Sequence, residues 1–153
     1  MITILRPVGP HGVRVPAAYP GAVPHPLMFD DADPLLRRVR AIALAFPDAA
    51  EKISHGHPAF YTTKVFGYYG GSIKVDGEYQ RHEHSLLVLA AAEDRLALLE
   101  DPRCYSPAYL GPSGWIGVDL DRRTDWTEIG ELLDDSYRLT AGKRRVARLD
   151  AAL

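Results

Sequence analysis

Two histidine pairs have the residue types and the spacing best suited to metal binding in this sequence. His55 and His57 form one pair and His82 and His84 the other, each with one residue between them. Residues i and i+2 of a β-strand point to the same face, about 7 Å apart. Two such strands side by side would present four imidazoles to Zn²⁺ or a related ion. The alternative is that the first pair packs a turn while the second lies on an exposed loop edge.

A group of cations near the C-terminus is the second candidate, because it could contact phosphates. The sequence predicts a last helix, capped by Thr140, whose apolar side carries Val146, Leu149 and Leu153 while the basic residues lie elsewhere. Such a helix can set cations against a nucleic-acid backbone, although most Lys/Arg runs are simply solvated helix faces. The cations that could contact a nucleic acid are Lys143, Arg144, Arg145 and Arg148, with Lys64 at the tip of a predicted hairpin.

Aromatic residues alternate along that hairpin, so one of its faces should enter the core and the other should leave tyrosines exposed. Exposed aromatic rings beside cations can stack on nucleic-acid bases, but such rings more often pack against other side chains. The alternating residues are Phe60, Tyr61, Phe66, Tyr68 and Tyr69, and Tyr105, Tyr109 and Trp115 are expected around a groove beside them.

Motifs typical of common enzyme classes are missing from the sequence. It contains neither a Gly-x-Ser-x-Gly elbow nor a His-Glu-x-x-His motif, and the glycine-rich segment 67–72 lacks the lysine of a phosphate-binding loop. We expect Tyr137 to pack against the sheet and Ser136 to hydrogen-bond a backbone carbonyl, rather than to act as a nucleophile. The sequence therefore favours a binding protein over an enzyme, and no cofactor is expected.

Composition fits one globular domain. The chain has 153 residues, 46% of them hydrophobic, and a net charge of −2, so its overall charge does not require a polyanionic partner. Cys104 is the single cysteine, which excludes an intrachain disulfide and a cysteine-based zinc site. No apolar run approaches the roughly 20 residues of a membrane span. We expect a cytoplasmic protein that does not enter membranes.

The order of predicted elements indicates an α+β fold. Residues 1–27 form a proline-rich arm, and residues 28–153 form the domain. Hydrophobic periodicity predicts helices over 30–46 and 93–100, the latter with Leu96 and Leu99 facing inward, and a helix that starts at Asp125. Strands are expected at 59–62, 65–69, 85–91 and 115–120, with Asp76-Gly77 as a turn. Strands joined by hairpins imply an antiparallel sheet with the helices packed mainly on one face.

Several short motifs, in order, resemble the small bacterial MmcQ/YjbR-type proteins. The similarity runs from about Asp31 to Arg148. The matching segments are Phe46-Pro47, Glu51, Gly56-His57-Pro58, Lys64-Val65-Phe66, Gly114-Trp115 and Asp134-Asp135-Ser136-Tyr137. The resemblance implies a YjbR-like, double-wing-like α+β domain and DNA as the partner.

The leading hypothesis is thus a small cytoplasmic, non-enzymatic protein that binds DNA, as a monomer or a weak homodimer. The first alternative is a metal-binding protein or metal-dependent enzyme that uses the paired histidines. The second is a protein–protein adaptor that uses the exposed tyrosines and the proline-rich arm.

Overall fold

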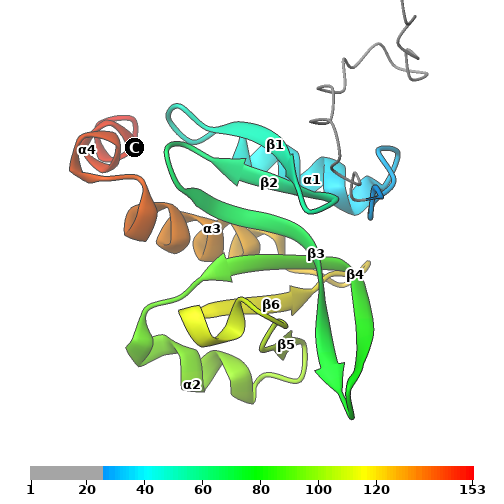
Figure 1. Ribbon diagram of the computed structural model, residues 1–153. Coiled ribbons are helices and arrows are strands. Elements are labelled where there is room, and N and C mark those ends of the chain that lie inside the picture. The colour runs from blue at the N-terminus through cyan, green and yellow to red at the C-terminus, as the bar shows by residue number, and fades with distance from the viewer. Residues whose placement is uncertain (1–25) are drawn as a thin grey trace, which may run out of the picture.

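Six antiparallel strands form a single sheet in the computed structural model, which describes residues 26–153 (Figure 1). Most of the predicted proline-rich arm, residues 1–25, lies outside the described residues. The strands follow the order β1-β2-β3-β4-β6-β5. Their bounds are β1 Ala50–Ser54, β2 His57–Tyr61, β3 Val65–Val75, β4 Glu78–Leu89, β5 Cys104–Tyr105 and β6 Trp115–Asp119. The predicted α+β class with an antiparallel sheet is confirmed.

Four α-helices and one 3₁₀ turn complete the described chain: α1 Pro34–Ala43, α2 Ala92–Glu100, η1 Gly111–Ser113, α3 Trp126–Thr140 and α4 Lys143–Ala151. Helix α1 begins where Asp33 accepts a hydrogen bond from the Leu35 N–H, with Pro34 at the first helical position. Helix α3 begins in the same way, because Asp125 accepts from the N–H groups of Thr127 and Glu128.

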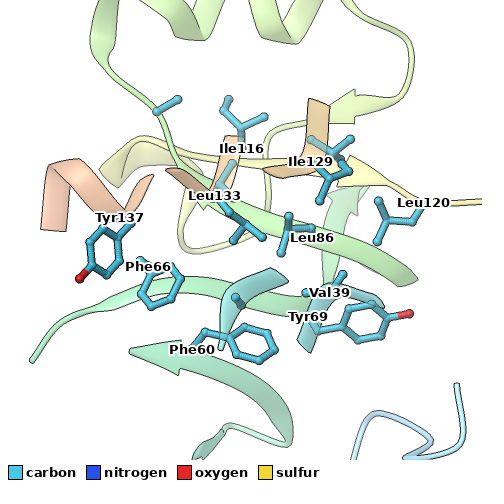
Figure 2. Packing of buried hydrophobic residues seen from close by; sticks show 14 of the residues in the cluster. Val39, Phe60, Phe66, Tyr69, Leu86, Ile116, Leu120, Ile129, Leu133 and Tyr137 are labelled. Atoms are coloured by element: carbon cyan, nitrogen blue, oxygen red, sulfur yellow. The ribbon is translucent and has the colours of Figure 1, made fainter. Parts of the chain in front are cut away.

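The core lies between one face of the sheet and helices α1 and α3 (Figure 2). Helix α1 contributes Leu36 and Val39, and α3 contributes Ile129, Leu133 and Tyr137. The strands supply Phe60, Phe66, Tyr69, Leu86 and Val88, all essentially inaccessible to solvent. Every second residue of a strand points to the same face, so Leu87, between Leu86 and Val88, lies on the opposite face.

Ser136 and Tyr137 fix α3 to the sheet as the sequence predicts. The buried Ser136 hydroxyl donates to the Phe66 carbonyl at 2.7 Å and accepts from the Leu89 N–H at 3.0 Å, beside the last pair of the β3–β4 ladder. The Tyr137 hydroxyl donates to the Pro47 carbonyl at 2.8 Å. These bonds connect α3 to both central strands and to the segment that precedes β1.

The hairpin β3–β4 is longer than the sequence indicates, because the polar stretch 72–84 continues both strands (Figure 1). The predicted Asp76-Gly77 turn is confirmed, and both residues have positive φ. An irregularity interrupts the hairpin where Tyr69 pairs with Leu86 but Gly71 pairs with His82. Three residues of β4 therefore oppose one residue of β3, which is a bulge that reverses the facing of the residues beyond it.

Two predictions about helices are wrong. Leu96 and Leu99 do not face inward but are 79% and 39% exposed, because the phase of α2 directs Leu98 towards the core instead. Thr140 does not cap α4, because it is the last residue of α3 and its hydroxyl donates to the Ser136 carbonyl within that helix. The residue before α4 is Gly142.

Candidate functional site at the start of helix α4

The first histidine pair does not lie on one strand. His55 and Gly56 form the two-residue turn between β1 and β2, with φ angles of 50° and 84°, and only His57 belongs to β2. The expectation that His55 and His57 share a strand face is therefore wrong. The physical reason is that a β-hairpin turn with two positive φ angles takes up one member of the pair.

The second pair is separated by the bulge of the β3–β4 hairpin. His84 Nδ1 lies 2.9 Å from the Asp33 carboxylate on the α1 side of the sheet. His82 Nδ1 lies 2.7 Å from Asp119, and its ring lies 4.1 Å from that of Tyr105, on the opposite side. The bulge thus breaks the i, i+2 relation on which the expected pairing depended.

The structure does not bring the four imidazoles together. Within residues 26–153, no three His, Cys, Asp or Glu side chains are arranged as a metal site. All four predicted ligands instead have protein partners for Nδ1: Ser54 Oγ for His55, the Tyr69 carbonyl for His57, Asp119 for His82 and Asp33 for His84.

The predicted basic residues do come together. Lys143, Arg144, Arg145 and Arg148 line a cavity of about 500 Å³ at the start of α4, which we call the α4 pocket. Asp48 is the one acidic residue among the described residues that line it. The cavity therefore combines four cations with a single carboxylate.

Asp48 organises two of these cations. Its Oδ2 atom accepts from Arg148 Nη1 at 2.8 Å and from Arg145 Nε at 3.1 Å. These two guanidinium groups hold the pKa of Asp48 below its usual range, Arg148 having the larger effect. Lys143 and Arg144 form no ion pair within the part of the chain that the structure describes, so they face solvent without a carboxylate partner.

Lys64 belongs to the same surface. Arg145 Nη1 donates to Thr63 Oγ1 at 3.2 Å, which joins the β2–β3 turn to α4. The next residue of the turn is the exposed Lys64. Four of the five cations predicted from the sequence thus line the α4 pocket, and the fifth, Lys64, follows Thr63 in the β2–β3 turn. Helix α4 lies near this turn and the C-terminus (Figure 1).

Comparison with known proteins places the chain in a family. Residues 44–139, more than half of the sequence, match the family model described as YjbR. The chain belongs to the YjbR family. A search of curated proteins found no match.

This YjbR-family protein also has a similar solved structure, that of Deinococcus radiodurans protein DR2400, which carries a DUF419 domain. The two chains are 17% identical, the match covers 71% of this chain and 79% of the other, and the TM-score is 0.51. At this identity the similarity concerns the fold alone. The family match ends at residue 139, so α4 lies beyond it.

Sequence reasoning missed one polar cluster in the YjbR-family chain. Asp33 accepts from the Leu35 N–H, the Tyr69 hydroxyl and His84 Nδ1, and its side chain is only 6% exposed. Burial raises the pKa of Asp33, but the three hydrogen bonds outweigh it and leave the pKa lowered. Burial and the Asp33 contact both raise the pKa of Tyr69, which therefore donates its proton. A capping Asp gives no sequence signal for such distant partners.

Among residues 26–153, no helix is both long enough and apolar enough to cross a bilayer.

Proposed function

We propose that this protein is a small cytoplasmic binding protein whose partner is DNA, contacted at the phosphates by the α4 pocket and the neighbouring Lys64. The observation that carries the proposal is the excess of cations in that pocket: four basic side chains line it and one carboxylate opposes them. Phosphate contacts by Lys and Arg provide most of the affinity of non-specific nucleic-acid binding.

Arrangement as well as number supports this role. Asp48 holds Arg145 and Arg148 at 3.1 and 2.8 Å, so their guanidinium groups are ordered before any ligand arrives. Lys143 and Arg144 stand in the first turn of α4, which Gly142 precedes without a side-chain cap. The N–H groups of a helix start favour an anion, so backbone and side chains act in the same direction.

Other arginines of the described residues are paired with carboxylates, one of which, Asp150, is on α4 itself. Arg138 is ion-paired with Asp134 and Asp150, and Arg103 with Asp101 and Glu128. The long β3–β4 hairpin carries acidic and basic residues in mixture. We therefore expect DNA phosphates to contact the α4 pocket rather than the β3–β4 hairpin.

The test is a fluorescence-anisotropy titration of a labelled DNA duplex at low salt. The double reversal Arg144→Glu/Arg148→Glu should abolish binding. The matched control is Arg122→Glu/Arg123→Glu, which makes the same change in charge at two exposed arginines between β6 and α3. The assignment of DNA contact to the α4 pocket would be overturned if wild type and the control variant did not bind DNA. It would also be overturned if both double variants lost the same affinity for DNA.

A further inference from the structure

A second cavity, of about 370 Å³, lies on the face of the sheet opposite α1 and α3. It is lined by the β3 backbone at Gly70 and Gly71, by the rings of Tyr68 and Tyr109, and by His57. Its volume is within the range of cavities that hold small organic ligands. It lies apart from the α4 pocket and shares none of its lining residues.

Two adjacent glycines keep β3 free of side chains in this cavity. A Cβ on Gly70 would lie 2.9 Å from His57 Nδ1, and the φ angle of 84° is itself unfavourable for other residues. A Cβ on Gly71 would lie 2.7 Å from the Tyr105 hydroxyl. Glycine is thus required at both positions for His57 and Tyr105 to approach the strand.

The two tyrosine rings are each supported by another aromatic ring. Tyr68 meets Trp115 edge-on, with ring centroids 5.1 Å apart. Tyr109 stacks on Tyr79 at 5.9 Å with an interplanar angle of 21°, and their hydroxyls are hydrogen-bonded. Tyr109 is nevertheless 81% exposed. Aromatic rings held in place beside a cavity offer surfaces for stacking of flat ligands.

His57 supplies a hydrogen-bond acceptor of fixed orientation. Its Nδ1 lies 3.1 Å from the Tyr69 carbonyl oxygen, which can only accept, so Nδ1 carries the proton. Burial lowers the pKa of His57 and so favours the neutral ring. The lone pair is then on Nε2. The described lining residues include His55 beside His57 but no Lys, Arg, Asp or Glu, so the cavity presents no permanent charge to a ligand.

We propose that this cavity binds a neutral nucleobase, stacked on a supported tyrosine ring, with a base N–H donated to His57 Nε2. A nucleobase is flat and carries N–H donors, which are the two properties that these groups recognise. The base can arrive as a free nucleoside or within a single strand, and the chemistry is the same in both. The proposal does not depend on DNA binding at α4.

The test is amide chemical-shift mapping on the full-length ¹⁵N-labelled protein. One arm adds adenosine, guanosine, cytidine or uridine, and the other adds a single-stranded octanucleotide of mixed sequence to the Arg144→Glu/Arg148→Glu variant. We expect saturable shifts at Gly70, Gly71 and Ser72 in at least one arm, with a Kd at or below about 1 mM. Shifts with nucleosides identify the free molecule as ligand, and shifts with the oligonucleotide alone identify a strand.

Two variants connect such shifts to the cavity. Tyr109→Ala removes an exposed ring and should weaken ligand binding about tenfold. His57→Phe keeps a ring but removes the acceptor, and should weaken ligand binding more than Tyr109→Ala does. Leu96→Ala is the control, because it truncates a comparably exposed residue on α2. The proposal is overturned if neither arm shifts these amides, or if the affinity of Tyr109→Ala equals that of Leu96→Ala.

Discussion

Asp48 Oδ2 lies 2.8 Å from Nη1 of Arg148, a residue one hundred positions later in the chain. This contact attaches α4 to the segment before β1 and places a carboxylate within a surface that is otherwise basic. Asp48 therefore has two opposing effects: it orders the arginines of the α4 pocket, and it repels phosphate.

Replacing Asp48 tests which effect dominates. Asp48→Asn keeps the size of the side chain and removes the single negative charge that lines the α4 pocket. We expect DNA affinity at low salt to rise a few-fold, roughly the effect of one exposed ion pair. Anisotropy titrations of wild type and Asp48→Asn measure it. A fall in affinity would mean instead that Asp48 is needed to position Arg145 and Arg148.

Stability should depend on pH through Asp33. Its folded pKa is lowered from the ordinary aspartate value of 3.8, so the ionised carboxylate stabilises the fold above that pH. This contribution is lost as pH falls through the folded pKa. Asp33→Asn keeps a capping side chain but loses the charge, and should reduce the free energy of unfolding by about 1.5 kcal/mol at pH 7.

Urea denaturation at pH 7 and at pH 3 measures this difference, with Asp135→Asn, at an exposed position of α3, as the control. The two variants should differ most at pH 7 and converge towards acid. Equal stability of Asp33→Asn and wild type at pH 7 would rule out a stabilising role for the carboxylate.

Ser136→Ala should destabilise the domain without affecting binding at α4. The change leaves the Phe66 carbonyl and the Leu89 N–H without the hydroxyl that bridges them in a buried site. Loss of a buried hydrogen-bond partner costs about 1–3 kcal/mol. Chemical denaturation measures the free energy of unfolding of Ser136→Ala, and Ser113→Ala, a change at an exposed serine of η1, is the control. A change of under about 0.5 kcal/mol would show that water or the strands replace the bridge.

Local signals in the sequence located much of the fold. Asp125 predicted the start of α3 because the N–H donors that its carboxylate caps lie only two and three residues further on. Asp76-Gly77 predicted a turn because few dipeptides adopt two positive φ angles. Ser136 and Tyr137 were also placed correctly. Their motif follows an amphipathic stretch whose apolar side must face the sheet.

The histidine pairs could not be placed from sequence, because their geometry depends on strand pairing. His55 lies in a turn, and the bulge opposite Gly70 puts His82 and His84 on different faces. A bulge depends on how two strands are paired in register, and the alternation of hydrophobic and polar residues along each strand does not determine that register. Asp48 was missed for a related reason: nothing near it in sequence indicates that it meets Arg148.

The salt dependence of DNA binding tests the central claim most directly. For wild type, log Kd plotted against log salt concentration should have a slope of magnitude about 2–4, since each phosphate neutralised adds about 0.9. Arg144→Ala should reduce that magnitude by about one, whereas Arg122→Ala should leave it unchanged. A slope that is the same for both variants and wild type, or DNA binding that does not depend on salt, would contradict a phosphate-contacting surface at α4.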